Sequence, residues 1–567
     1  MKKRLPFIIA IISCCVFYCK TNQAVANVFA SQLKIINPDD SPFDGNFSDG
    51  TGAKISFLLN AAASSVIVVV KDAANGNIIA QIDGGAMGSG LNSVDWDGTG
   101  AETGKQYIYE VTAVQPNASS TDWRVFFDSG DIEIFTRGCA VVKDMSSPLF
   151  GLIYTPNTGG DLPQVGKGIT IYNPDGSFHD PFLVAADIND GGTINWGGGS
   201  DVMYGAVFDA LERFYVSAIQ FGEIRRLNQD FSITSVITGL TNPIGLFLQG
   251  EGDALTLYVV SDNKILRGNI GTADAMNASD MEVLAQFSGF FPHQINLDDE
   301  GFLYVSLRSG NFLGSDGRGI RKYDITGTLP VTDDDALWFL GEEKTFIAND
   351  LVFDRGADRN SAADDILYFV TRAGGGRDED GIWRIDDINS IFPDVIRIIT
   401  EDDFYGDDSN VQSRASFDFD AAGNIVFMEN ANEHLFLISP PGEGETNSFT
   451  TTSPDTFTVS VTVGVEEPGL AKTPKSYELY QNYPNPFNPS TTIKFSLSQS
   501  ETISLRIYDL NGRLIRTLIE SDKRSRGLNR VEWDGKDNSG SLIPSGRYVY
   551  TLESGKFKSS KIMTLAK

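Results

Sequence analysis

The chain has 567 residues, with 45 Lys and Arg against 75 Asp and Glu, so its formal net charge is −30. Proteins bind nucleic acids and anionic membranes mainly through Lys and Arg, and the acidic excess therefore disfavours both classes of partner. Hydrophobic residues make up 41% of the chain and aromatic residues 11%, which excludes a disordered protein and indicates several folded domains.

Residues 1–26 have the pattern of a secretory signal peptide. A basic start at residues 1–4 precedes an apolar run over residues 5–19, and the small residues Ala24-Val25-Ala26 follow. This order predicts export with cleavage after Ala26. The run is shorter than the roughly 20 residues that a transmembrane helix needs, and no other segment comes close to that length. The alternative cleavage position lies before Cys14, in a lipoprotein-like sequence.

Cysteine use agrees with this interpretation. Cleavage after Ala26 removes three of the four cysteines and leaves Cys139. A single cysteine cannot form an internal disulfide, so the exported chain must be held together by its core, its sheets or metal ions.

Two segments, one near each end of the chain, repeat the same landmarks in the same order. Each has a first strand, an apolar second strand, an Asn-Gly turn, a tryptophan motif and a closing strand. In the first segment these lie, in that order, at residues 51–59, 66–70, 75–76, 91–98 and 104–109. In the second segment they lie at residues 491–497, 503–508, 511–512, 528–535 and 546–550. Asn-Gly favours a hairpin because both residues tolerate positive φ. The short alternating strands predict two Ig-like β-sandwiches, with Trp96 and Trp533 in their cores rather than in ligand sites. Both segments resemble the Ig-like module of the flagellar hook-capping, FlgD-like family.

A proline-rich segment precedes the second sandwich: Tyr483, Pro484, Asn485, Pro486, Phe487, Asn488 and Pro489. Proline fixes φ and lacks a donor, so this segment cannot be a central strand. With Gly546, Tyr548 and the terminal strand at residues 558–563, it resembles the type A C-terminal sorting domain of the type IX secretion system. The resemblance implies a Gram-negative bacterium, recognition by the type IX translocon and sorting machinery, and release or attachment at the outer-membrane surface. The alternative is an ordinary terminal Ig-like module.

Between the sandwiches, a pair of strands recurs six times. The first strands end in apolar-aromatic triplets at residues 152–154, 214–216, 257–259, 303–305, 367–369 and 425–427, and the second strands lie at residues 168–172, 222–226, 263–267, 319–323, 381–385 and 434–438. A period of about 50 residues with loops of variable length predicts a β-propeller. Six blades are expected, with seven as the alternative. The strand pattern resembles that of NHL and gluconolactonase-like propellers.

The predicted protein is therefore all-β. Its segments are a signal peptide (1–26), an Ig-like module with a connector (27–138), the propeller (139–442), a linker or propeller-closing strand (443–475) and the sorting domain (476–567). Within the fourth segment, residues 457–463 alternate between apolar and polar types, which makes them the candidate for the strand that closes the ring.

Ligand sites of propellers usually lie at the axial mouth, where the loops that enter the innermost strands converge. The candidates at these positions are Tyr204, Asn242, His293, Asn349, Asp350 and Arg414. His293 is a candidate base or ligand, against the alternative of an ordinary hydrogen-bonding histidine. The three histidines fall in different blades without metal-ligand spacing, which disfavours zinc. The sequence contains no nucleophile-elbow, zinc-protease or phosphate-binding motif.

One acidic segment is a candidate for Ca²⁺: Asp354, Asp358, Asn360, Asp364 and Asp365. Oxygen ligands on one loop suit Ca²⁺, although the spacing is not that of an EF-hand. A solvated acidic loop is the alternative, and the sequence indicates no other cofactor.

Taken together, the sequence favours a non-enzymatic, exported or cell-surface protein whose propeller binds a glycan, small molecule or protein. The first alternative is a secreted lactonase or glycan-directed hydrolase with a divalent metal at the propeller mouth. The second is a structural component of the cell envelope.

Overall fold

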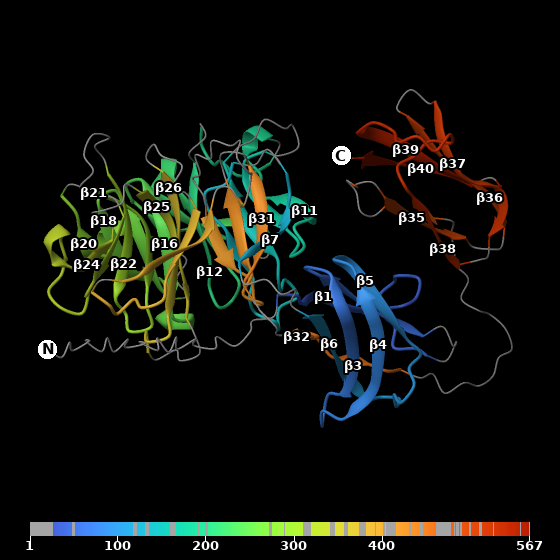
Figure 1. The fold of residues 1–567 in the computed structure, drawn as a ribbon, viewed down its shortest axis with the longest axis horizontal. Helices are drawn as coiled ribbons and strands as arrows, with labels where there is room; N and C mark the ends of the chain where they lie inside the picture. Colours follow the sequence, from blue (N-terminus) through green and yellow to red (C-terminus); the bar gives the residue numbers. More distant parts are fainter. Residues whose placement is uncertain are drawn as a thin grey trace, which may run out of the picture. The chain divides into compact units, whose positions relative to one another are not determined.

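The computed structural model describes residues 27–565 except 48–51, 117–121, 131–134, 159–165, 191, 199–201, 229, 272–274, 289, 310–318, 341–345, 356–360, 374–380, 392, 401–402, 404–415, 430–432, 442–445, 461–477, 481, 483–486, 488–489, 498–500, 510–512, 525–526 and 556. The protein is all-β (Figure 1). The helices that are described over their full length are 3-10 helices of three residues each: η1 (Ile188–Asp190), η2 (Ile219–Phe221), η3 (Gly252–Ala254), η4 (Ala278–Asp280) and η5 (Asp333–Asp335). None of them could cross a membrane.

The first β-sandwich is built from two sheets. One has the order β1 (Ala30–Ile36), β2 (Ala53–Leu59) and β5 (Gly90–Trp96), and the other has the order β32 (Thr446–Thr452), β6 (Gln106–Pro116), β3 (Ala63–Asp72) and β4 (Ile78–Met87). Alternate residues of β3 are buried, as expected for a strand with one face on a core. Trp96 is buried, which confirms its predicted core position.

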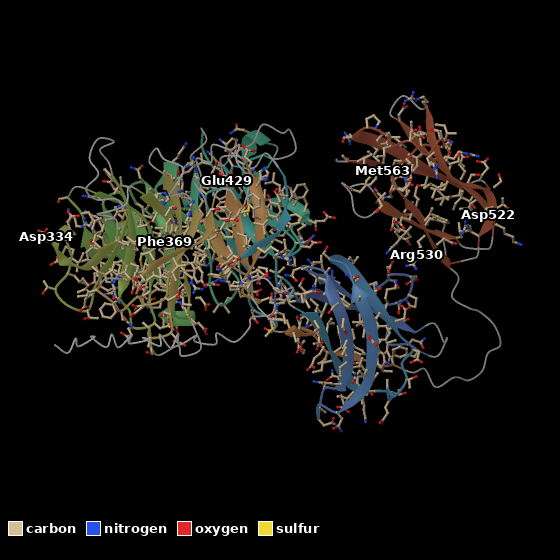
Figure 2. All side chains as sticks on the ribbon, viewed as in Figure 1. Asp334, Phe369, Glu429, Asp522, Arg530 and Met563 are labelled. Atoms are coloured by element: carbon tan, nitrogen blue, oxygen red, sulfur yellow. The ribbon has the colours of Figure 1, made fainter. Side chains whose placement is uncertain are left out.

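The second β-sandwich has the same design. Its sheets are β34 (Glu478–Leu479), β35 (Thr491–Leu497) and β38 (Gly527–Trp533), and β37 (Leu514–Arg524), β36 (Glu501–Asp509), β39 (Gly546–Ser554) and β40 (Phe557–Leu565). Trp533 is buried, as predicted, and its ring lies 5.4 Å from that of Phe487. Met563, labelled in Figure 2, is also fully buried in this core.

The strands described within residues 124–128 and 140–439 form six sheets. The first two blades, from inner to outer strand, are β8 (Ala140–Val141), β9 (Ile153–Asn157), β10 (Gly168–Tyr172) and β11 (Phe178–Val184), and β12 (Met203–Phe208), β13 (Phe214–Ala218), β14 (Glu223–Leu227) and β15 (Ile233–Thr238), the last of which also pairs with β19 (Met276–Asn277). The next two are β16 (Pro243–Gln249), β17 (Thr256–Ser261), β18 (Lys264–Asn269) and β20 (Glu282–Gln286), and β21 (Phe290–Leu297), β22 (Leu303–Ser309), β23 (Gly319–Tyr323) and β24 (Ala336–Leu340). The last two are β25 (Phe346–Asp354), β26 (Ile366–Ala373), β27 (Gly381–Ile385) and β28 (Val395–Thr400), and β29 (Ser416–Phe419), β30 (Ile425–Glu429), β31 (His434–Ser439) and β7 (Arg124–Asp128).

The innermost strands close a ring. Each of β8, β12, β16, β21, β25 and β29 contacts the next, and β29 contacts β8. Each blade has four antiparallel strands, apart from the short parallel addition of β19. The six-bladed propeller predicted from the repeat is therefore the fold of this region.

The strand that completes the sixth blade is β7, which precedes the first blade in the chain. It pairs with β31, with Arg124 opposite Ser439 and Phe127 opposite Leu437. The prediction that residues 457–463 close the ring is wrong for the part that is described, because β33 (Phe457–Thr458) pairs with β6 in the first sandwich. The outermost strand of a blade needs only an unpaired strand edge, here that of β31, and an apolar face. β7 follows β6 in the chain and pairs with this edge.

The propeller is thus inserted into the first sandwich, between β6 and β32. β32 runs antiparallel to β6, from Thr446 opposite Pro116 to Thr452 opposite Glu110, and Figure 1 shows it in orange beside the blue strands of the sandwich. The boundaries expected from sequence shift accordingly: residues 124–128 of the predicted connector belong to the propeller, and residues 446–458 of the predicted linker belong to the sandwich.

Candidate functional site

Four innermost strands carry a β-bulge at the same level of the propeller. The irregularities lie between Tyr204 and Ala206, Pro243 and Leu246, Pro292 and Ile295, and Ala348 and Asp350. A bulge adds a residue to one strand and changes the direction of its side chains. Residues of all four bulges consequently line one small cavity on the propeller axis.

This narrow cavity has a volume of about 20 Å³, enough for about one water molecule. It brings together four of the predicted mouth residues: Tyr204, His293, Asn349 and Asp350. Asn242 precedes β16 and is not among the lining residues, whereas Arg414 lies outside the described residues. Sequence reasoning missed Arg137, Gln294 and Ser416, which also line the cavity.

Aromatic and cationic groups pack at this cavity. The Arg137 guanidinium donates a hydrogen bond to the Tyr204 hydroxyl and lies 4.8 Å from the ring centroid of Tyr204. The Tyr204 and His293 rings meet edge to face, with their centroids 6.0 Å apart. His293 Nδ1 lies 2.8 Å from the carbonyl oxygen of Asn349, and since a carbonyl only accepts, Nδ1 carries the proton and donates.

Asp350 is a buried carboxylate on the axis. Its Oδ1 accepts from Gln294 Nε2 at 3.1 Å and from the Leu351 N–H at 2.9 Å. Its Oδ2 accepts from Ser416 Oγ at 2.6 Å and from the Phe417 N–H at 3.2 Å. Burial raises the pKa of Asp350 to about 6, although these hydrogen bonds oppose the shift.

Gln294 ties three blades together. Its Nε2 donates to Asp350 on β25, and its Oε1 accepts from the Leu246 N–H on β16 at 3.1 Å. Gly245 lies so close to Gln294 that a larger residue would not fit in its place. A Cβ there would lie 2.4 Å from Gln294 Oε1 and 2.5 Å from the His293 carbonyl oxygen. The bulged level of the axis is therefore a packed, hydrogen-bonded plug.

A second, wider cavity of about 420 Å³ continues along the axis from this plug. It shares Gln294, Asp350 and Ser416 with the narrow cavity, and it extends to the segments where the innermost strands end. Its wall includes apolar and aromatic side chains, among them Leu246, Phe208, Phe247 and Phe417. This volume lies within the range of small-molecule sites, which the narrow cavity does not reach.

Both cations that line the wide cavity are paired with a carboxylate. Lys143 Nζ lies 2.6 Å from Asp418 Oδ1, and Asp418 Oδ2 accepts from the Val141 N–H at 2.9 Å. Arg355 donates to Asp299 Oδ1 at 2.6 Å and to Asn296 Oδ1 at 3.1 Å. The sequence gives no signal for this cavity, because its lining comes from both ends of the innermost strands and from separate blades.

The predicted calcium residues are only partly described. Asp358 and Asn360 lie outside the described residues. Asp365 is buried, accepts a hydrogen bond from the Asp299 N–H at 3.1 Å, and has its pKa raised to about 6 by burial. Among the described residues, no three His, Cys, Asp or Glu side chains converge as metal ligands would, so the calcium site stays a prediction.

The predicted sorting residues are also partly described. Tyr483, Pro484, Asn485, Pro486, Asn488 and Pro489 lie outside the described residues. Phe487 is buried, and its N–H donates to the Thr564 carbonyl oxygen at 3.0 Å, which joins it to β40. Tyr548 donates its hydroxyl hydrogen to the Pro544 carbonyl oxygen at 2.7 Å, and Gly546 begins β39 with φ of +154°.

Solved structures with a similar chain course share little sequence with this protein. PorZ, a bacterial surface component of the type IX secretion system of Porphyromonas gingivalis, is 13% identical with a TM-score of 0.32, over 92% of this chain and 69% of PorZ. A gluconolactonase from Xanthomonas campestris is 12% identical with a TM-score of 0.36, over 58% of this chain and 97% of the enzyme. The virginiamycin B lyase of Staphylococcus aureus is 14% identical with a TM-score of 0.31, over 56% of this chain and 99% of the lyase.

Sequence comparison supports the two sandwiches. No curated protein matches this chain. The family model of the FlgD Ig-like domain matches residues 44–117 and 486–556, which lie in the first and second sandwich respectively. The two flanking modules predicted from the repeated landmarks are therefore FlgD-like Ig modules.

Proposed function

We propose that this chain is an exported binding protein whose propeller takes a small ligand, or a small part of a larger one, in the wide axial cavity. The observation that carries the proposal is the difference between the two cavities: about 420 Å³ in one and about 20 Å³ in the other. A ligand of drug size fits in the first and is excluded from the second.

Binding is favoured over catalysis by the state of the candidate acid–base groups. Asp350 accepts four hydrogen bonds, and His293 Nδ1 is bound to a backbone carbonyl. His293 belongs to the packed plug, where a substrate has no room. Asp350 also lines the wide cavity, but both of its carboxylate oxygens already accept hydrogen bonds. A general base has to reach the proton that it removes, and neither group is placed to do so.

Delivery by the type IX secretion system completes the proposal, with the second sandwich as the sorting domain and the first 26 residues as the signal peptide. Support comes from the proline-rich segment in the sequence and from the contacts of Phe487 with Trp533 and β40. These contacts would hold the segment at Phe487 against the terminal strand.

The binding proposal is tested by narrowing the wide cavity. Ala210 is an exposed lining residue, so A210W should reduce its volume without breaking a core contact. Ligands found on glycan and small-molecule arrays should bind the wild-type chain and lose affinity in A210W. The neighbouring exposed Leu211 is not a lining residue, and L211W serves as the matched control. Equal loss in both variants, or in neither, would refute the cavity as the site.

The sorting proposal is tested separately. A chain that lacks residues 476–567 should stay in the periplasm, whereas the full chain reaches the surface. Cell fractionation and protease accessibility distinguish these locations. Surface display of the truncated chain would contradict the proposal without affecting the proposed ligand site.

A further inference from the structure

Three carboxylates that line the wide cavity form no ion pair with a described Lys or Arg: Asp144, Glu212 and Asp350, of which Asp350 accepts four hydrogen bonds at the plug. The cations that line the cavity are Lys143 and Arg355, and each is 2.6 Å from a carboxylate oxygen of Asp418 or Asp299. Within the described part of the chain, no Lys or Arg forms an ion pair with Asp144 or Glu212, which also line it. This part of the wall therefore carries uncompensated negative charge.

Glu212 is held in a fixed conformation. It lies in the turn between β12 and β13 with φ of +57°, where a residue other than glycine is uncommon, and its N–H donates to the Asp209 carbonyl oxygen at 2.9 Å. Its Oε2 accepts a hydrogen bond from Ser147 Oγ. Its Oε1 is buried and has no hydrogen-bond partner.

A buried carboxylate oxygen without a donor is costly, and a positive charge bound nearby in the cavity would offset part of this cost. Burial raises the pKa of Glu212, and the nearby charge of Asp144 raises it further. Both effects disfavour the carboxylate in the free protein, so the site gains most from a ligand that brings a positive charge.

An aromatic wall accompanies these carboxylates. Phe208 lies at the end of β12, and its ring centroid is 5.1 Å from that of Tyr154. Burial and the charge of Glu212 raise the pKa of Tyr154 to about 12. Glu212 and Phe208 therefore both lie near the same tyrosine. Phe247 is also in the cavity wall, and Arg355 shows that a cation can lie over its ring, at 5.7 Å from the centroid.

We propose that the wide cavity binds a ligand carrying an ammonium group, which pairs with Glu212 and Asp144 while its apolar part packs on Phe208 and Phe247. The inference rests on the proposed binding function and names its ligand class. A divalent metal ion fits less well, because Ca²⁺ takes about six to eight oxygen ligands, whereas Glu212 and Asp144 each have one carboxylate oxygen that already accepts a hydrogen bond. An anionic ligand would be repelled.

The test compares three aromatic probes of similar size on the full-length exported chain: benzylamine, benzyl alcohol and benzoate. Isothermal titration calorimetry or ligand-detected NMR should show benzylamine binding about tenfold or more tightly than benzyl alcohol, and no binding of benzoate. E212Q should weaken benzylamine about tenfold and leave benzyl alcohol unchanged, since only the charge is removed. D144N should act in the same direction with a smaller effect.

Matched controls separate charge from folding. E251Q alters an exposed carboxylate outside the cavity and should bind all three probes as the wild type does. Thermal unfolding of E212Q should match that of the wild type, and if it does not, D144N carries the test because Asp144 is exposed.

Several outcomes would overturn the inference. Undiminished benzylamine binding in both E212Q and D144N would do so, as would equal affinity for benzylamine and benzyl alcohol, or displacement of benzylamine by Ca²⁺ alone. Binding of benzyl alcohol or benzoate that A210W abolishes would leave the cavity as a ligand site with a different specificity. Failure of every probe and every array ligand would reject the binding function itself.

Discussion

At the scale of residues, Asp350 shows how the propeller axis depends on buried polar groups. Its carboxylate accepts four hydrogen bonds from three blades, and burial still raises its pKa to about 6. The raised pKa means that the folded state holds this proton more tightly than the unfolded state does. The stabilisation by the neutral form is therefore complete below pH 3.8, the ordinary pKa, and is lost as the pH rises through about 6.

We predict that D350N flattens this part of the pH dependence. In the wild type, the free energy of unfolding should fall by on the order of 3 kcal/mol between pH 4 and pH 7 on account of Asp350. The amide does not ionise, so D350N should lose stability less steeply over that range. Urea unfolding followed by tryptophan fluorescence at several pH values measures the slope. An exposed-carboxylate control, D253N, should keep the wild-type slope, and an equal slope in D350N would contradict the prediction.

Gly245 is a second residue on which the axis depends. G245A would place a methyl group against the backbone of His293, which cannot move without disturbing the bulge on β21. We expect a loss of about 1–3 kcal/mol in the free energy of unfolding, as for other overpacked positions. At Gly327 an added Cβ has no neighbour within 4 Å, so G327A should change stability little. Equal stability of the two variants in a denaturant titration would argue against a close-packed axis.

At the scale of elements, β7 decides whether the propeller closes. The Ser129 N–H donates to the Leu435 carbonyl oxygen at 3.0 Å, which extends the pairing of β7 with β31. The Phe127 ring occupies the space beside Gly176, where a Cβ would lie 2.1 Å from the ring, so it also joins the sixth blade to the first. β7 therefore connects two blades from opposite ends of the repeat.

We predict that V125D and F127D together detach β7. Both side chains are half-buried, and replacing them by carboxylates removes apolar contacts and adds a desolvation cost, about 3 kcal/mol or more in total. Amide hydrogen exchange should then increase in β31 and in β10 before the other blades. R124D changes an exposed residue of the same strand and should leave exchange near the wild-type level. An equal increase in amide exchange across all six blades would contradict the prediction, because the loss of β7 would then not act first on the two blades that it joins.

At the scale of the whole molecule, the insertion couples the propeller to the first sandwich. Thr451 on β32 donates its hydroxyl hydrogen to the Ala30 carbonyl oxygen at 2.6 Å, and Phe449 packs with Phe29 and Phe150. Phe150 precedes β9 of the first blade, so this cluster includes residues of both the sandwich and the propeller. The pairing of β32 with β6 thus holds together the two segments that enter and leave the propeller.

We predict that F449A lowers the stability of the sandwich and the propeller together, by about 1–3 kcal/mol for this half-buried ring. Differential scanning calorimetry should show both transitions at lower temperature. T450A, at the exposed neighbouring position, is the control and should shift neither transition by a comparable amount. A shift of the sandwich transition alone would mean that the two modules unfold independently.

The sequence by itself determined the classes of module and their order. The recurring strand pairs predicted a six-bladed propeller, and the tryptophan motifs predicted two Ig-like sandwiches with Trp96 and Trp533 in their cores, because local alternation and turn residues report strands directly. Four of the six mouth residues predicted from sequence converge on the axis, although they lie within the innermost strands β12, β21 and β25 rather than in the segments that precede them.

Only the tertiary structure decided which strands are partners and where space remains. The pairing of Arg124 with Ser439, and of Pro116 with Thr446, joins segments more than 300 residues apart, and it follows from closing a ring rather than from any local pattern. The wide cavity and the uncompensated Glu212 depend on side chains that the blades bring together around the axis. Sequence periodicity describes one strand at a time, so it could not separate the packed end of the axis from the open one.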